Sequence, residues 1–202
     1  MSRIVAGVDE VGRGCLAGPV VCAAVILPTE HRPWIDQIRD SKKLSPKKRQ
    51  LLAEYIIQEC VYSISDAPAY VVDDMNILRA TLWTMEKAVR SLSVTPDLVL
   101  VDGNHRIPGL EIPQEAIIGG DNIHKAIGAA SIIAKVSRDA WMKDVHLLHP
   151  MYGWNKNKGY GTAEHREAIM VYGLTPLHRR TFKGVTEYVT GPETSRDDTF
   201  LT

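Results

Sequence analysis

The stretch GVDEVGRG, residues 7–14, decides the fold of this chain. The apolar run IVAGV, residues 4–8, leads directly into two adjacent carboxylates, Asp9 and Glu10, and a glycine-flanked arginine follows. A short buried strand that ends in acidic residues and continues into a loop of small residues is typical of α/β proteins that bind a ligand at a strand's end. A strand that simply stops in a polar turn has the same local pattern, so the rest of the sequence must distinguish the two.

Length and composition are those of an ordinary globular protein. The chain has 202 residues, of which 45% are hydrophobic and 24% charged, which is enough to build a substantial core. We expect one domain over residues 1–190, with a helical C-terminal part from about residue 140 and a disordered tail over residues 191–202. Because the formal net charge is zero, a polyanion would have to bind at a local cluster of Lys and Arg.

The cysteines and histidines argue against disulfides and zinc. Cys15, Cys22 and Cys60 are odd in number and lack CxxC spacing, which favours a reducing cytosol. His146 and His149 have no acidic or thiol partner at ligand spacing. The sequence shows no signal peptide and no apolar run long enough to span a bilayer. We therefore expect a cytoplasmic protein that does not associate with membranes.

Three apolar segments that we predict to be strands each lead into an acid. They are residues 3–8 before Asp9, residues 97–101 before Asp102, and residues 115–118 before Gly119, Gly120 and Asp121. In α/β sheets, ligands bind in the crevice beyond the strand ends. The repetition therefore predicts that these carboxylates converge on one site.

Two further strands and four helices complete the predicted α/β pattern. Residues 20–27 should pair antiparallel with the first strand, because the connection is too short for a parallel crossover, and residues 61–65 should form another strand. The helices are expected to begin at Ser45-Pro46, to cover residues 76–92 and 125–148, and to follow Thr162. Lys135, Arg138 and Asp139 should begin the solvated half of the helix over residues 125–148.

Four carboxylates, Asp9, Glu10, Asp102 and Asp121, could form a cluster without His or Cys, which suits Mg²⁺ or Mn²⁺ better than zinc. Crowded carboxylates raise one another's pKa, so the cluster needs a cation to stay ionised. Two such ions about 4 Å apart would activate a water and stabilise the leaving oxygen in phosphodiester hydrolysis. Asp139 is an alternative fourth acid, but it lies well inside a helix, whereas Asp121 follows a strand and two glycines.

Basic and small residues in the loops could hold a polyanion beside the acids. The basic residues are Lys42, Lys43, Lys47, Lys48, Lys156, Lys158, Arg179 and Arg180. Each basic pair taken alone is more typical of a solvated surface. Gly12 and Gly14 would let the backbone approach a sugar or phosphate, because no Cβ intervenes. Arg13 could contact a phosphate or form a salt bridge within its loop, and Tyr160 could anchor its loop or serve as a stacking platform.

Six segments, taken in order, resemble the motifs of the ribonuclease HII family, the type 2 ribonucleases H, in their bacterial form. They are GVDEVGRG (7–14), DSKKLSPKKR (40–49), VDGN (101–104), GGD with AASIIAKVSRD (119–139), KGYGT (158–162) and HRRTF (178–182). The resemblance covers residues 3–188. It implies a ribonuclease H-like α/β fold, with a mixed β-sheet flanked by helices and a small helical C-terminal part.

The same resemblance implies a monomeric endonuclease that depends on Mg²⁺ or Mn²⁺ and cleaves RNA in RNA–DNA hybrids. It also implies cleavage on the 5′ side of a single ribonucleotide embedded in duplex DNA, leaving 3′-hydroxyl and 5′-phosphate ends. In that case the metal ligands and catalytic residues would be Asp9, Glu10, Asp102 and Asp121.

Substrate-binding residues are also carried over from the resemblance. Gly12, Arg13 and Gly14 would read the 2′-hydroxyl and the adjacent phosphate through the backbone. The 2′-hydroxyl is the group that distinguishes RNA from DNA at one position. Tyr160 would pack on the sugar of the following deoxynucleotide. The other expected contacts to substrate are Lys42, Lys43 and Arg179.

Two other functions remain open from the sequence. One is a structure-selective DNA nuclease with the same fold, which would cut an all-DNA duplex as fast as a duplex with one ribonucleotide. The other is a non-catalytic nucleic-acid binding module. The complete set of acids argues against a pure binder, because clustered negative charge that faces phosphates weakens binding.

Overall fold

A five-stranded mixed sheet forms the centre of the protein, and its strand order is β3-β2-β1-β4-β5. The computed structural model describes residues 3–39 and 41–189, except for the side chain of Lys42. The strands are β1 (Val5–Val11), β2 (Val20–Ile26), β3 (Val61–Ala67), β4 (Leu98–Asp102) and β5 (Gln114–Ile117). β1 pairs antiparallel with β2 and parallel with β4, which confirms the predicted α/β class and the antiparallel return. The tail over residues 191–202 lies outside the described residues.

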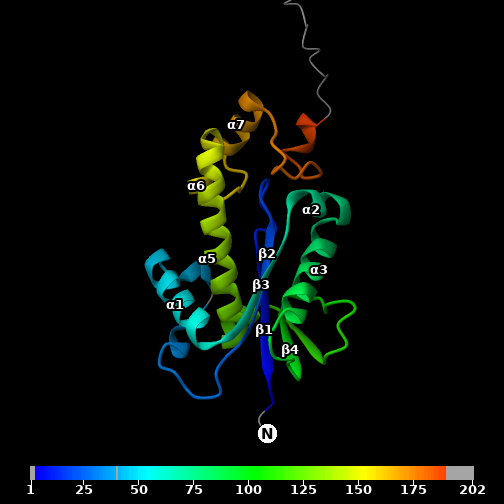
Figure 1. Cartoon of the computed structure of the whole chain (residues 1–202). Helices are drawn as coiled ribbons and strands as arrows, with labels where there is room; N and C mark the ends of the chain where they lie inside the picture. Colours follow the sequence, from blue (N-terminus) through cyan, green and yellow to red (C-terminus); the bar gives the residue numbers. More distant parts are fainter. Residues whose placement is uncertain (1–2, 40, 190–202) are drawn as a thin grey trace, which may run out of the picture.

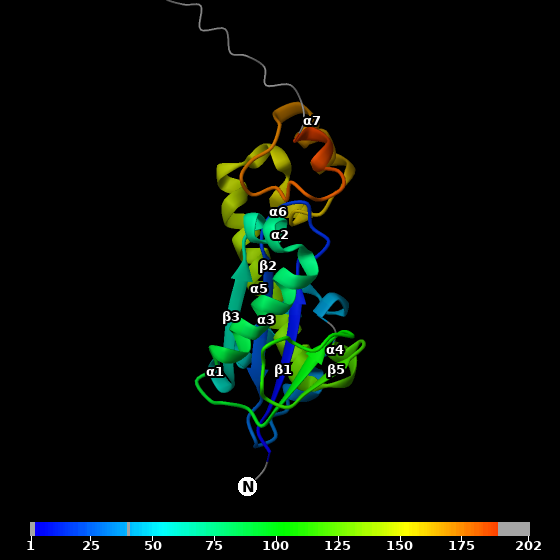
Figure 2. The same ribbon diagram turned by 90° about the vertical axis from the view of Figure 1, so that its right-hand side faces the viewer.

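Helices cover both faces of the sheet (Figure 1). α1 (Pro46–Glu59) and α5 (Lys125–Leu148) pack on one face, and α3 (Ile77–Arg90) packs on the other. Beyond one end of the sheet, the C-terminal end of α5 carries the small helices of the C-terminal part (Figure 2). The shorter helices are α2 (Ala69–Met75), α4 (Gly120–Ile123), α6 (Trp154–Asn157) and α7 (Ala163–Tyr172). Single 3₁₀ turns lie at Ile35–Gln37, Ser41–Lys43, Pro150–Tyr152 and Thr186–Tyr188.

Two helices, α1 and α7, start where the sequence predicts them, because the predicted capping side chains bind the first free amides. The Ser45 hydroxyl accepts a hydrogen bond from the Lys48 amide at 3.3 Å, and Pro46 occupies the first turn of α1. The Thr162 hydroxyl accepts from the His165 amide at 3.2 Å at the start of α7. These local signals fixed the helix positions correctly.

Three local features differ from the sequence prediction. β1 does not end at Val8 but continues to Val11, because β2 pairs with it as far as Val11. α2 is a helix that the sequence analysis did not predict, and its N-cap, Pro68, makes no side-chain cap bond that could have signalled it. A four-residue helix, α6, lies between the predicted helix over residues 125–148 and the predicted helix after Thr162.

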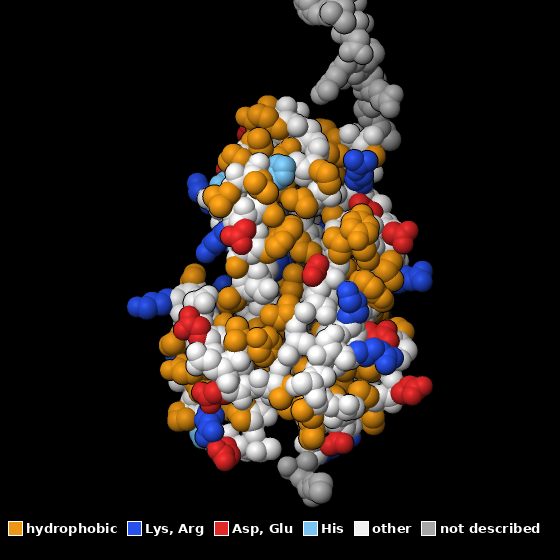
Figure 3. All heavy atoms as spheres, in the orientation of Figure 1, with side chains coloured by type: hydrophobic (Ala, Val, Ile, Leu, Met, Phe, Trp, Pro, Cys, Tyr) orange, Lys and Arg blue, Asp and Glu red, His pale blue; other side chains and the backbone are white. Residues whose placement is uncertain are grey.

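Figure 3 shows the molecular surface in the orientation of Figure 1. Lys, Arg, Asp and Glu side chains are interspersed along both sides of the visible face, and no broad area carries charge of one sign. Exposed hydrophobic side chains gather over the C-terminal part, where Leu147, Leu148, Met170, Val171 and Tyr172 are exposed. None of the helices in the described part of the chain combines the length and the hydropathy needed to cross a bilayer.

The close approach of α5 to β1 depends on Gly7. A Cβ at this position would lie 2.2 Å from the backbone carbon of Ala126 and 2.2 Å from the backbone nitrogen of Ile127. Neither contact is with a flexible side chain, so a larger residue would force the helix and the strand apart. Gly7 therefore sets the distance at which α5 lies across the sheet.

We expect Gly7→Ala to lower the free energy of unfolding by about 3 kcal/mol, because the added methyl group meets the backbone of α5. Denaturant unfolding followed by circular dichroism measures the change. Gly14→Ala is the matched control, since a Cβ there would meet nothing within 4 Å, and its stability should stay within about 0.5 kcal/mol of the wild type. Equal stability of the two variants would contradict this account of the packing.

Candidate active site

Three of the predicted carboxylates converge at the centre of the sheet. Each of Asp9, Glu10 and Asp102 offers a ligand oxygen, and these atoms all lie within 4.8 Å of one another. The register pairs Val8 with Val101, so Asp9 and Asp102 are the next residues along two adjacent parallel strands. β4 ends at Asp102, whereas β1 continues to Val11. The site is therefore a product of strand register and strand length.

The electrostatics of the three carboxylates fit a divalent cation. Asp9 is only 5% exposed, and burial followed by the charges of Glu10 and Asp102 raises its pKa well above the usual value. Burial also raises the pKa of Glu10, although Arg13 opposes that effect. Three carboxylate oxygens and no imidazole or thiol form a hard donor set of the kind Mg²⁺ and Mn²⁺ take. A cation would offset the mutual repulsion of these groups.

Asp121 does not belong to this group of three in the described structure. It lies in α4, directly after Gly120, and its Oδ1 accepts a hydrogen bond from the Asn122 side chain at 3.0 Å. The Gly120 amide donates to Asp102 Oδ1 at 2.7 Å, so the turn that carries Asp121 is tied to the cluster through Asp102. The sequence thus predicted three convergent acids correctly, and Asp121 stays a prediction.

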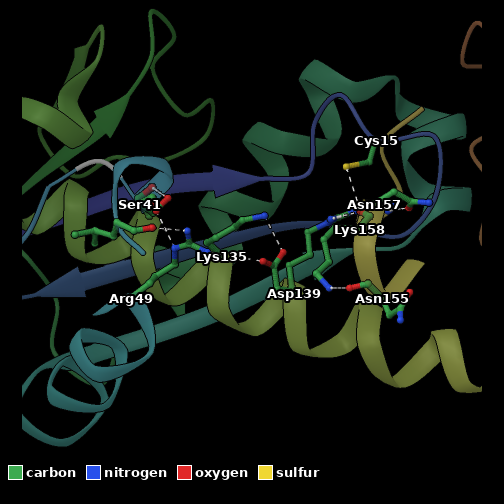
Figure 4. Close-up of polar contacts among 12 residues, drawn as sticks. Cys15, Ser41, Arg49, Lys135, Asp139, Asn155, Asn157 and Lys158 are labelled. Atoms are coloured by element: carbon green, nitrogen blue, oxygen red, sulfur yellow. Dashed lines mark hydrogen bonds and ion pairs between the residues drawn. The ribbon is translucent and has the colours of Figure 1, made fainter. Parts of the chain in front are cut away.

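The alternative acid Asp139 has other partners. Its Oδ1 accepts from Lys135 Nζ at 2.8 Å, and its Oδ2 lies 3.9 Å from Arg49 Nη1 (Figure 4). Arg49 in turn donates from Nε to the Ser41 carbonyl at 2.8 Å. Asp139 therefore pairs with two cations, and one of them, Arg49, binds the segment after residue 40.

Two serines that sequence reasoning missed support the cluster. Ser131 interacts with the Asp9 carboxylate, which favours the charged form of Asp9. The Ser131 hydroxyl also lies 2.9 Å from the Ser41 hydroxyl, and both residues are buried. Ser131 is the polar residue within the otherwise apolar stretch of residues 126–134 in α5, and that irregularity was the available signal.

Lys43 lies beside the turn that carries Asp121. Its Nζ donates to Asn122 Oδ1 at 2.8 Å, which places an ammonium group next to the acid-bearing turn. Lys42 belongs to the same 3₁₀ turn, but its side chain lies outside the described part of the structure. The predicted basic segment therefore lies next to α4.

Arg13 forms the salt bridge that was one of its two predicted roles. Its Nη1 lies 3.3 Å from Glu10 Oε1, and its side chain is 47% exposed. The guanidinium therefore faces solvent at the edge of the carboxylate cluster, where an exposed ion pair contributes little stability. Among the described residues, only Nη1 of Arg13 has a partner, so its remaining donors are available to a ligand.

The two glycines that flank Arg13 differ in their physical role. Gly12 has φ +89°, and a Cβ there would lie 2.3 Å from Arg138 Nε, so the protein itself requires glycine. Gly14 is exposed, its φ lies outside the left-handed region, and a Cβ would meet nothing within 4 Å. The open space at Gly14 is therefore available to a molecule that approaches from outside.

Tyr160 lies directly across from the loop that contains these glycines. Cys15 and Tyr160 form an isolated antiparallel bridge, and their side chains interact. Burial, with the Cys15 sulfur as a further cause, raises the pKa of the Tyr160 hydroxyl. The residue is nevertheless 40% exposed. Tyr160 thus combines an anchored hydroxyl with an exposed surface next to Gly14.

Arg179 and Arg138 differ from the sequence expectations. Arg179 was expected to contact substrate and Arg138 to lie on a solvated helix face, yet both are 0% exposed. Arg179 donates from Nη1 to the Arg13 carbonyl at 2.9 Å and from Nε and Nη2 to the Gly18 carbonyl at 3.0 and 2.9 Å. A ligand cannot reach a guanidinium that is enclosed in this way, so Arg179 acts through the loop it binds.

A mixed five-stranded sheet with an all-carboxylate cluster on two adjacent parallel strands is the arrangement of an α/β enzyme that uses divalent metal ions. The sequence matches the Ribonuclease HII family over residues 6–185. The Ribonuclease HII of Syntrophus aciditrophicus is 53% identical over 90% of this chain and 84% of that protein. This chain therefore belongs to the ribonuclease HII family.

Solved structures agree with this assignment. The ribonuclease H2 of Pyrococcus horikoshii OT3 superposes with a TM-score of 0.76 at 27% identity, over 91% of this chain and 96% of that one. Bst-RNase HIII, solved in complex with Mn²⁺, has a TM-score of 0.76 at 18% identity, over 93% of this chain and 70% of that one. At 18% identity, the likeness to Bst-RNase HIII shows a shared fold.

Removing one buried charge should stabilise the metal-free protein. We expect Asp9→Asn to raise the free energy of unfolding by about 1–2 kcal/mol in EDTA at pH 8, because the repulsion with Glu10 and Asp102 is relieved. Mg²⁺ should raise the melting temperature of the wild type and leave that of the variant nearly unchanged. Asp144→Asn, on the exposed part of α5, is the control and should behave as the wild type. A variant less stable than the wild type in EDTA would contradict the crowding argument.

Proposed function

We propose that this protein is a divalent-metal-dependent ribonuclease H-type endonuclease that cuts the RNA strand of RNA–DNA hybrids. We further propose that it cuts on the 5′ side of a single ribonucleotide in duplex DNA and leaves 3′-hydroxyl and 5′-phosphate ends. Membership in the ribonuclease HII family supports the reaction class. The observation that carries the proposal is the convergence of Asp9, Glu10 and Asp102 within 4.8 Å.

In this proposal, Asp9, Glu10 and Asp102 hold Mg²⁺ or Mn²⁺, and Asp121 is the fourth ligand. Its place one residue after Gly120, whose amide binds Asp102, supports that role. When bound, divalent ions supply Lewis-acid activation of water and stabilisation of the leaving oxygen. The chain contributes the register that presents the oxygens and the buried serine contact that orients Asp9. Burial of the site strengthens each of these electrostatic interactions.

In this proposal, the loop after β1, which contains Arg13 and Gly14, recognises the ribose. Gly14 leaves space beside exposed backbone, so a sugar with its 2′-hydroxyl and the adjacent phosphate can approach closely. Arg13 offers a charged contact to that phosphate from the edge of the cluster. Tyr160 presents its exposed surface to the next sugar, where a deoxyribose packs without a hydroxyl in the way. Lys43 adds positive charge beside α4 for the backbone of the substrate.

The proposed site needs only one copy of the chain, and the free cysteines favour a reducing compartment. The carboxylates, the glycine loop and Tyr160 all come from one chain, which supports a monomeric enzyme. Cys15, Cys22 and Cys60 are free thiols, which supports action in the cytoplasm.

The direct test uses a duplex that carries one ribonucleotide, with mapping of the cut position. The wild type should cut once, on the 5′ side of the ribonucleotide, and only when Mg²⁺ or Mn²⁺ is added. Asp102→Asn should lower kcat by roughly 1,000-fold while the circular dichroism spectrum stays that of the wild type. Asp144→Asn should retain full activity. Equal cutting of an all-DNA duplex would favour a DNA nuclease, and binding without cutting would favour a non-catalytic module.

Tyr160→Ala tests recognition of the following sugar. We expect kcat/KM on the single-ribonucleotide duplex to fall by about 10-fold, because the surface that packs on the deoxyribose is removed. The loss on a long RNA–DNA hybrid should be smaller. Tyr70→Ala removes a tyrosine that is 72% exposed on α2 and serves as the control. Equal losses on both substrates would assign Tyr160 a structural role instead.

A further inference from the structure

Two buried arginines bind the backbone of the loops that the proposed function uses for recognition, and one of them, Arg138, binds both loops. We call residues 12–19, which contain Gly12, Arg13 and Gly14, the glycine loop, and residues 158–161 the tyrosine loop. Arg138 and Arg179 are both 0% exposed, and within residues 3–39 and 41–189 neither forms an ion pair with a carboxylate. Burying a guanidinium without a carboxylate partner costs free energy, so its hydrogen bonds must offset the loss of hydration.

Arg138 bridges the two loops directly. Its Nε and Nη2 donate to the carbonyls of Pro19 at 2.8 Å and Ala17 at 3.0 Å, in the glycine loop. Its Nη1 donates to the Lys158 carbonyl at 2.8 Å, in the tyrosine loop. The planar guanidinium offers these donors in a fixed geometry, so the three carbonyls are held at fixed relative positions.

Arg179 holds the other side of the glycine loop. Its guanidinium binds the carbonyls of Arg13 and Gly18, and its own amide donates to the Leu16 carbonyl at 2.8 Å. Burial lowers the pKa of Arg179 to about 10, which leaves the group charged at neutral pH. The glycine loop is therefore bound from two directions, by Arg138 and by Arg179.

The loops also contact one another without space between them. The Leu16 amide donates to the Gly159 carbonyl at 2.8 Å, and the Cys15 sulfur lies 3.6 Å from the Lys158 carbonyl (Figure 4). A Cβ at Gly159, where φ is +83°, would lie 2.3 Å from the Ala17 carbonyl oxygen. A side chain at position 159 would therefore push the two loops apart.

The tyrosine loop is fixed on its far side as well. His165 Nδ1 lies 2.9 Å from the Tyr160 carbonyl, and the Trp154 indole nitrogen donates to His165 Nε2 at 3.0 Å. Tyr160 therefore has a defined position relative to the C-terminal part, and Arg138 sets its position relative to the glycine loop.

We infer that Arg138 is a positioning residue that sets the preference for a ribose followed by a deoxyribose. This inference rests on the proposed function, in which Gly14 and Tyr160 read two consecutive sugars. Reading two sugars at once requires the two readers to stay at one spacing, and an error of about 1 Å can cost 100-fold in rate. Arg138 touches neither sugar and acts by holding the carbonyls of both loops.

The test compares kcat/KM on a duplex with one ribonucleotide and on a long RNA–DNA hybrid. Arg138→Lys keeps the charge but cannot bind three carbonyls in one plane. It should lower kcat/KM on the single-ribonucleotide duplex by about 10-fold or more and on the hybrid by less than about 3-fold. Arg90→Lys, an exposed arginine of α3 paired with Glu86, is the control and should change neither value.

Gly159→Ala provides a second variant in which no buried charge is altered. It pushes the two loops apart directly and should give the same selective loss. Equal losses on both substrates, or no loss on either, would overturn the inference. If Arg138→Lys does not fold, the result for Gly159→Ala decides between these outcomes. Wild-type enzyme that fails to cut at a single ribonucleotide would instead overturn the proposed function.

Discussion

The close packing of α5 against β1 is the constraint on which the rest of the structure depends. Gly7 allows this contact, since any Cβ would meet the helix backbone at 2.2 Å. Along the same helix, Ser131 reaches Asp9, Arg138 reaches the glycine loop, and the last turns carry the C-terminal part. A shift of α5 would therefore move the supports of the cluster and the recognition loops together.

The carboxylate cluster is unfavourable for the protein without a cation. Burial and neighbouring charge raise the pKa of Asp9 well above its usual value, which means that folding brings like charges together. Such strain at a functional site is stabilised by the surrounding structure, here by the sheet and the contact with Ser131. A bound divalent ion would be ligated by the carboxylates and would offset their mutual repulsion. This is the physical reason that the site fits a metal ion.

The sequence predicted the features that local chemistry determines. Capping residues placed the helix starts, and acids after apolar runs identified Asp9 and Asp102. Prediction from the sequence failed for residues whose environment is set by tertiary contacts. Arg138 lies on a helix position that looked solvated, but the glycine loop and the tyrosine loop enclose it. The requirement for glycine at position 12 also depends on Arg138, a neighbour that is 126 positions away in the sequence.

Calorimetric titration of Mn²⁺ into the metal-free protein tests the central claim, that the crowded carboxylates are a divalent-cation site. We predict saturable binding to the wild type, binding weakened by about 10-fold or more in Asp9→Asn and Asp121→Asn, and wild-type binding in Asp139→Asn. Selective weakening in Asp121→Asn would also establish the fourth ligand. Undiminished binding in Asp9→Asn would contradict the account, because the cation would then be held elsewhere.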